Sequence, residues 1–205
     1  LFECLDKHQL AENTIVIFMG DNGTAAGAGN GPYDGFNAGM RGKKGTVFDG
    51  GHRVACFVRW PRGLEAGHEI RQLTSCRDWL PTLIELCDLH APKDLRFDGK
   101  SLVPLLTQKA EFWPDRTLFV ERQGDQPTLE KPNGPRARYP HYAVLTERWR
   151  LVDGALFNIG DDPGQQSNLA SEYADVARDL RTQYEKHFAD VFSDDAAYTR
   201  FQLGA

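Results

Sequence analysis

Two neighbouring residues near the start of the chain carry oxygen atoms that suit a metal ion. Asp21 and Asn22 stand in Gly20-Asp21-Asn22-Gly23, directly after the apolar run at 15–19. Carboxylate and amide oxygens are hard donors, which Ca²⁺ and Mg²⁺ prefer. Two such ligands do not complete a cation site, so this chemistry needs further carboxylates from elsewhere. A plain turn after a strand explains the same residues without any ligand.

A lysine on the following loop offers the complementary charge. Lys44 lies in Gly42-Lys43-Lys44-Gly45-Thr46, where the glycines let a backbone N–H and an ammonium approach one anionic oxygen together. The P-loop pattern requires glycine at position 37, where this chain has asparagine, so the match to a nucleotide-binding loop fails. Solvated surface lysines are the simpler alternative.

Other reactive side chains give weaker signals. His52 is interpreted as structural, and Arg53 is expected to pair with a buried carboxylate, either Asp49 or Asp78. No serine or cysteine stands in a nucleophile-elbow pattern. The residues of this chain can therefore bind a cation and an anion, but they include no convincing nucleophile.

Composition excludes several classes of protein. The 205 residues carry 24 Lys and Arg against 29 Asp and Glu, so the formal net charge is −5 and nothing suggests the clustered basic face that binding of nucleic acid would need. No apolar run reaches the length of a membrane span. Four cysteines, at 4, 56, 76 and 87, form no C-x-x-C pair, so a zinc ribbon is not expected. We predict that they are buried free thiols, while one disulfide stays open as an alternative.

The elements that must position Asp21, Asn22 and Lys44 follow from hydrophobic periodicity. Residues 1–10 read as the end of a helix, without an initiator Met or an N-cap, so we expect the sequence to begin inside a longer protein. The run at 14–19 is typical of a parallel strand covered on both faces. A loop with eleven glycines covers 20–53, and a second strand is predicted at 54–60. Ligands of open α/β sheets bind beyond the carboxyl ends of such strands.

The rest of the chain predicts a helix and then a small antiparallel sheet. We expect an edge strand at 71–73, a helix at 78–87 and a short apolar segment at 102–106 that Ser101 caps. Strands are predicted at 117–121, 142–146, 149–152 and 155–158, with Asp153-Gly154 as a hairpin turn. A helix over 169–191 should cover this sheet. The stretch 123–140 is an exposed excursion, either a specificity loop or decoration.

Taken in order, several of these motifs resemble the type I, formylglycine-dependent sulfatase family. The resemblance covers most of residues 1–190, and the ordered set is far more specific than any one motif. The matching stretches are Asn13-Thr14-Ile15-Val16-Ile17-Phe18-x-x-Asp21-Asn22-Gly23, Arg41-Gly42-x-Lys44-Gly45-Thr46-x-x-x-Gly50-Gly51-x-Arg53-Val54, Val58-Arg59-Trp60-Pro61, Asp78-x-x-Pro81-Thr82-Leu83, Asp98-Gly99-x-Ser101-Leu102-x-Pro104-Leu105-Leu106 and Leu156-Phe157-Asn158-x-x-x-Asp162-Pro163-Gly164-x-x-x-Asn168-Leu169.

The resemblance implies a fold, an activity and a site. The implied fold is alkaline-phosphatase-like α/β, with residues 1–109 as the C-terminal part of the catalytic domain and its central sheet. Residues 110–205 would form a small subdomain of antiparallel strands and the helix 169–191. The implied activity is hydrolysis of sulfate esters, small molecules or sulfated glycans, in a periplasmic, secreted or lysosomal enzyme. Asp21 and Asn22 match a pair of Ca²⁺ ligands, and Lys44 matches the lysine that binds a sulfate oxygen.

The chain also departs from the family pattern. The Cys/Ser-x-Pro-x-Arg motif that carries the formylglycine is missing, so we expect the nucleophile upstream of this chain and no turnover by the chain alone. Lys43 stands where glycine is usual, which suggests a more anionic substrate. Two alternatives stay open: a phosphatase or phosphodiesterase relative of the alkaline phosphatase superfamily, which would need more His and Asp ligands, and a non-catalytic domain.

Overall fold

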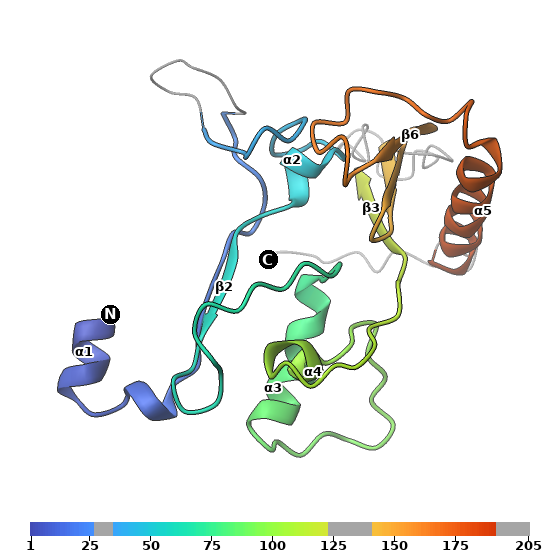
Figure 1. Ribbon diagram of the computed structural model, residues 1–205. Helices are drawn as coiled ribbons and strands as arrows, with labels where there is room; N and C mark the ends of the chain where they lie inside the picture. The colour runs from blue at the N-terminus through green and yellow to red at the C-terminus, as the bar shows by residue number, and fades with distance from the viewer. Residues whose placement is uncertain (27–34, 123–140, 192–205) are drawn as a thin grey trace, which may run out of the picture. The chain divides into compact units, whose positions relative to one another are not determined.

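The computed structural model describes residues 1–26, 35–122 and 141–191, and it groups the chain into two compact units. The first unit comprises Leu1–Gly23 and Arg53–Arg116, and the second comprises Thr24–His52 and Thr117–Ala205. Figure 1 shows the elements of both. In chain order they are α1 (Phe2–Lys7), β1 (Val16–Met19), α2 (Asp49–His52), β2 (Cys56–Arg59), α3 (Trp79–Leu86), α4 (Val103–Leu106), β3 (Leu118–Arg122), β4 (His141–Leu145), β5 (Trp149–Val152), β6 (Ala155–Asn158) and α5 (Ala174–Val191).

Strands β1 and β2 form a two-stranded sheet in the first unit, and they run antiparallel. The predicted parallel arrangement is therefore wrong for this pair. A parallel connection needs a crossover that returns the chain to the starting end of the sheet. In the described residues between the two strands, only the one-turn helix α2 is formed, so the chain turns back and pairs in the opposite direction.

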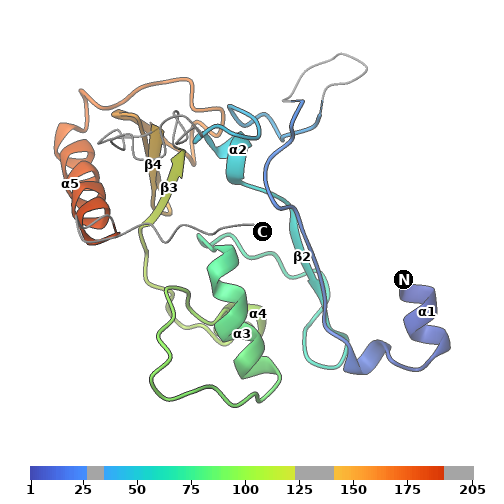
Figure 2. The same cartoon turned by 180° about the vertical axis from the view of Figure 1, so that it is seen from behind.

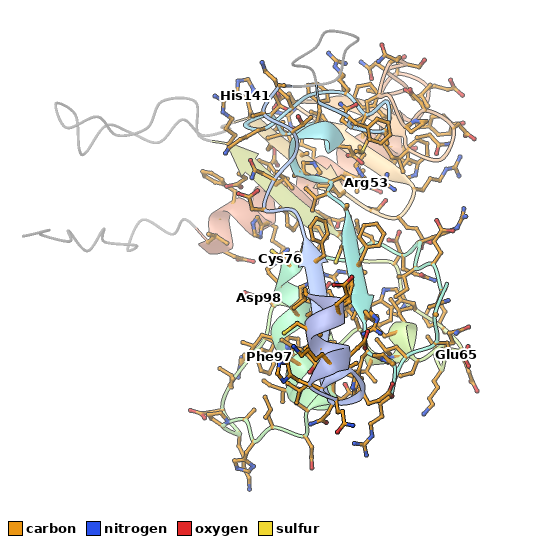
Figure 3. All side chains as sticks on the ribbon, turned by 90° about the vertical axis from the view of Figure 1, so that its left-hand side faces the viewer. Arg53, Glu65, Cys76, Phe97, Asp98 and His141 are labelled. Carbon is orange, nitrogen blue, oxygen red and sulfur yellow. The ribbon has the colours of Figure 1, made fainter. Side chains whose placement is uncertain are left out.

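The faces of this two-stranded sheet are not covered as predicted. Phe18 is 64% exposed and Phe57 is 67% exposed, although both carry large apolar rings. All four cysteines are exposed free thiols, so the prediction of burial is wrong for each of them. Figure 3 shows one of these, Cys76, directly before α3. Two strands of four residues each have too little surface to enclose side chains. Of β2, only Val58 packs against the core formed by Leu102, Leu105 and Leu106.

Helices α3 and α4 form the core of the first unit around Leu102, Leu105 and Leu106. Asp78 lies fully buried at the start of α3, where it accepts hydrogen bonds from the backbone N–H of Ser75 and Lys100. These bonds tie the turn before α4 to the start of α3. Figures 1 and 2 show the helices α3 and α4 side by side. The predicted helix at 78–87 is confirmed, whereas the predicted edge strand at 71–73 is not formed.

Strands β3 to β6 form an antiparallel four-stranded sheet in sequence order in the second unit. The four predicted strands are confirmed to within a residue at each end. Asp153 and Gly154 both have positive φ, at 48° and 88°, which is the backbone of the hairpin turn that their sequence predicts. The helix predicted over 169–191 begins later, at Ala174. The excursion at 123–140 lies outside the described residues.

The two faces of this sheet have different coverings. On one face, Tyr142, Val144, Leu151 and Leu156 pack against α5, whose Tyr184 is fully buried and stacks on Tyr142 at 4.0 Å between ring centroids. Figures 1 and 2 both show α5 along this sheet. The predicted cover of the sheet by its C-terminal helix is thereby confirmed.

The opposite face of the sheet is covered by the loop that carries Lys44. Phe48 of this loop packs edge-on against Phe157 of β6, with ring centroids 6.5 Å apart. Asp49 of α2 pairs with Arg150 of β5. A segment from the first quarter of the sequence thus packs on strands that follow it by about a hundred residues.

Candidate functional site

Asp21 and Asn22 lie immediately beyond the end of β1. Gly20 donates its N–H to the carbonyl of Ala55 at 3.2 Å, which extends the β1–β2 pairing by one residue. A Cβ atom on Gly20 would lie 3.0 Å from the Cβ of Val54, so a larger residue would push the two strand ends apart. The glycine therefore fixes where the two oxygen-bearing side chains leave the sheet.

The amide oxygen of Asn22 fits a metal ligand. This Oδ1 atom is buried and has no hydrogen-bond partner in the described part of the chain. A buried acceptor without a donor costs about 1–3 kcal/mol, and a bound cation removes that cost. The Asp21 carboxylate next to it is exposed and carries the negative charge that a Ca²⁺ site needs. Asn22 and Asp21 thus fit a calcium ion by donor chemistry.

The described residues do not complete a cation site by themselves. No group of three or more His, Cys, Asp or Glu side chains in residues 1–26, 35–122 and 141–191 is arranged to hold a metal ion. Ca²⁺ takes six to eight oxygen ligands. Asp21 and Asn22 would therefore supply only a minority of its coordination shell.

Lys44 stands at the second position of a tight turn. Thr46 donates its N–H to the carbonyl of Lys43 at 2.9 Å, and Gly45 has a φ of 83° at the third position. Positive φ at this position and negative φ before it define a type II turn, which requires glycine there. The Thr46 hydroxyl also bonds the Lys43 backbone, at 2.8 Å to its oxygen and 3.1 Å to its nitrogen. The turn thereby presents the Lys44 side chain to solvent from a fixed backbone.

A buried ion pair anchors the segment that carries this turn. Arg150 donates from Nε to both carboxylate oxygens of Asp49, at 3.0 and 3.3 Å, and its Nη1 donates to backbone carbonyls of Thr146 and Trp149. The side chains of Arg150 and Asp49 are 5% and 1% exposed. Because both charges are buried and hydrogen-bonded, the pair fixes α2 against β5 with little freedom.

Gln165 provides a second anchor from the turn at Asp162-Pro163-Gly164. Its side-chain oxygen accepts the Asp49 N–H at 3.0 Å, and its carbonyl accepts from Arg41 at 3.1 Å. The residue is fully buried and has a φ of 51°. The Lys44 turn is therefore bracketed by two contacts to the four-stranded sheet and the turn that follows it.

Sequence reasoning missed both Arg150 and Gln165. A signal for Arg150 existed, because it occupies an inward position in the otherwise apolar strand Trp149-Arg150-Leu151-Val152, where a charge requires a buried partner. No comparable signal marks Gln165.

In the first unit Arg116 pairs with Asp78 through three hydrogen bonds of 3.0 Å. The pairing of Arg53 with Asp49 or Asp78 stays a prediction.

The predicted site residues are divided between the two units. Asp21 and Asn22 belong to the first, and Lys44 belongs to the second. His52, interpreted as structural, lies 3.2 Å from the Val47 carbonyl oxygen and 3.9 Å from the Asp49 carboxylate. Figure 3 shows Arg53 on the segment that leads into β2.

Comparison with known proteins identifies the family. The sequence profile described as "Sulfatase" matches residues 1–89. The sulfatase YdeN of Escherichia coli, itself uncharacterized, is 34% identical over 88% of this chain and 36% of its own length. The chain belongs to the sulfatase family. Other relatives of this sulfatase chain are mouse steryl-sulfatase, 39% identical over 56% of the chain, and human N-acetylgalactosamine-6-sulfatase, 28% identical over 91%.

Solved structures confirm the predicted fold class. The protein Ps i-CgsB in complex with k-i-k-neocarrahexaose superimposes with a TM-score of 0.74 at 24% identity, over 95% of this sulfatase chain and 41% of that one. The phosphonate monoester hydrolase of Agrobacterium radiobacter gives a TM-score of 0.66 at 25% identity, over 98% and 40%.

The match covers only part of each relative. The chain spans 19% of mouse steryl-sulfatase, 36% of YdeN and 40% of the human enzyme. In the described part of the chain, no helix is both long and apolar enough to cross a membrane.

Proposed function

We propose that this chain supplies part of the calcium and sulfate-binding site of a sulfuric ester hydrolase. The observation that carries the proposal is the family match, because the profile over residues 1–89 includes Asp21, Asn22 and Lys44 together. The formylglycine nucleophile is proposed to lie on a part of the enzyme outside this sequence. The isolated chain should therefore bind ligands without turnover.

Each of the three residues has a proposed role that its surroundings support. Asp21 and Asn22 would hold Ca²⁺, since the buried Asn22 oxygen otherwise has no partner in the described residues. When bound, the ion would neutralise part of the negative charge on a sulfate group. Lys44 would bind a sulfate oxygen, because the type II turn fixes the backbone from which its ammonium extends. Fixed charges of this kind stabilise the sulfuryl oxygens in the transition state.

The proposed substrate class is a sulfate ester on a sugar. One relative is named for N-acetylgalactosamine 6-sulfate chemistry, and one solved neighbour contains a bound neocarrahexaose. Lys43, exposed beside Lys44, adds a second positive charge that would favour a substrate with more than one anionic group. Replacing Lys43 with alanine should raise KM for a polysulfated substrate, and an unchanged KM would remove this argument.

The test compares aryl sulfate and aryl phosphate hydrolysis by the full-length protein. Asp21→Ala and Lys44→Ala should each abolish most sulfate turnover, and a calcium chelator should do the same to the wild type. Lys109→Ala, an exposed lysine of the first unit, is the matched control and should leave turnover unchanged. Sulfate turnover that survives both site substitutions would contradict the proposal. A preference for phosphate would favour the phosphatase alternative.

A binding measurement tests the metal site without turnover. Calcium should raise the melting temperature of the wild type but not of Asp21→Ala or Asn22→Ala. Ligand binding stabilises the folded state by an amount that grows with the ratio of free ligand to Kd. Equal calcium-dependent shifts in all three proteins would place the metal elsewhere and leave Asp21-Asn22 as a structural turn.

A further inference from the structure

An arginine from the four-stranded sheet lies beside the Lys44 turn. The guanidinium carbon of Arg122, the last residue of β3, is 4.0 Å from the position that a Cβ atom on Gly45 would take. Lys44 immediately precedes Gly45, so the Arg122 guanidinium lies against the turn that carries Lys44, 78 positions earlier in the sequence. Both residues belong to the second unit.

Strand register places a histidine next to this arginine. Arg122 pairs with His141 across β3 and β4, and direct cross-strand partners have Cβ atoms about 4.5–5.5 Å apart on one face. The same register puts them on the sheet face of Arg150 and Phe157, which contact the Lys44 segment. Figure 3 shows His141 at the start of β4.

Arg122 and Lys44 differ from His141 in whether a carboxylate lies beside them. In the described residues, no carboxylate forms an ion pair with Arg122 or Lys44, and both side chains are exposed. The Nδ1 atom of His141 lies 2.8 Å from the Asp153 carboxylate, whose other oxygen accepts the Tyr142 N–H at 2.9 Å. Asp153 thus holds the imidazole through its Nδ1 atom and orients the ring.

We propose that Arg122, with His141 beside it, forms a second anion-binding subsite next to the sulfate-binding Lys44. The inference rests on the proposed function and deepens it, because it assigns the substrate class as a saccharide with two anionic groups. A guanidinium binds planar carboxylates and tetrahedral sulfates through two parallel hydrogen bonds, which a lysine cannot do. Lys44 would hold the sulfate that is cleaved, and Arg122 would hold the second sulfate or a uronate carboxylate of the same substrate.

The experiment separates one-anion from two-anion substrates in the full-length protein. The substrates are an aryl sulfate, a disulfated glucosamine and a sulfated disaccharide that contains a uronate. Arg122→Gln should raise KM for a two-anion substrate about tenfold to a hundredfold, as expected for a lost charge-assisted hydrogen bond, with kcat unchanged. Its kcat/KM for the aryl sulfate should stay within about twofold of the wild type. Selective loss on the disulfated sugar or on the uronate identifies the second group as sulfate or carboxylate.

Two further variants make the result specific. Arg148→Gln removes an exposed arginine that lies over the Trp149 ring, and it should leave KM unchanged for every substrate. Arg122→Lys keeps the charge but loses the two parallel bonds, so its KM should fall between those of the wild type and Arg122→Gln. Unchanged melting temperatures would show that all three variants fold.

The outcomes distinguish this inference from the function on which it rests. A wild type without sulfate turnover overturns the proposed function and the subsite with it. If the wild type turns over sulfate esters but Arg122→Gln leaves KM unchanged for both two-anion substrates, only the subsite is overturned. An equal rise of KM for the aryl sulfate would show that Arg122 acts on the cleaved sulfate and would also overturn it.

Discussion

The buried pair between Asp49 and Arg150 should carry a large share of the local stability around the Lys44 turn. Asp49→Asn keeps the shape of the side chain but removes its negative charge from a guanidinium that is 5% exposed. Removing one partner of a buried ion pair costs about 3–5 kcal/mol, since the remaining charge loses its compensation. At 1.4 kcal/mol for each factor of ten, the opening equilibrium of this region should rise roughly a hundredfold to several thousandfold.

Hydrogen–deuterium exchange of the β5 amides in the full-length protein measures this change, because exchange reports local opening rather than global unfolding. Protection of the β5 residues Arg150 and Leu151 should fall by the same factor. Asp175→Asn is the control. The side chains of Asp175 and its partner Arg178 are 84% and 67% exposed, so this ion pair should contribute nothing measurable to stability.

A double substitution tests the physical reasoning. Asp49→Asn combined with Arg150→Met removes both charges, and a buried pair replaced by groups without charge is often neutral. The double variant should therefore recover much of the protection lost in Asp49→Asn. Unchanged β5 protection in Asp49→Asn would refute the reasoning, because the carboxylate would then not compensate the buried guanidinium.

Three further outcomes follow from individual residues. Gly45→Ala and Gly67→Ala both force alanine to positive φ, at 83° and 78°, so each should cost about 1–2 kcal/mol in thermal unfolding. Only Gly45→Ala should also raise KM for a sulfate ester, and an equal effect of both on KM would contradict the role of the turn. Thr82→Val removes a buried hydroxyl that accepts the Leu102 N–H at 2.8 Å, so urea unfolding should show a loss of about 1–3 kcal/mol, and a neutral result would count against this bond. The protein around the Cys56 thiol removes part of its water and so raises the pKa of this thiol, and its thiolate fraction near pH 8 is therefore smaller in the folded than in the unfolded chain. Iodoacetamide should label it faster in urea at that pH, with the difference vanishing above the raised pKa, and equal rates at pH 8 would contradict this.

The raised pKa of Cys56 also determines how the stability of the folded state depends on pH. A thiol whose pKa is raised on folding favours the folded state below its ordinary pKa, and this contribution is lost as pH rises through the raised pKa. Cys56 should therefore lower stability in alkaline solution, and Cys56→Ser should flatten that dependence.

Local sequence determined most of the secondary structure of this protein. Apolar and aromatic runs bounded by turn residues predicted the four strands from β3 to β6. Asp153-Gly154 predicted its turn, since few residues adopt positive φ without strain. The site residues Asp21, Asn22 and Lys44 were found from residue type and spacing, together with the ordered motifs of the sulfatase family. Their roles stay proposals.

Long-range pairing was decided only by the tertiary structure. The sequence of β1 has the apolar run of a parallel strand, but strand direction depends on the connection, and this one lacks a crossover helix in the described residues. Apolar character likewise predicted buried cysteines, although burial depends on what covers a strand rather than on the strand itself.

The surroundings of Lys44 show the same limit. Asp49 and Arg150 are 101 positions apart, and Gly45 and Arg122 are 77 apart, so no local pattern relates the members of either pair. A charge in a strand indicates that it needs a partner, but not which one. Residue chemistry specified what the loop could bind. Packing of that loop on the four-stranded sheet decided which cationic side chain, Arg122, lies beside it.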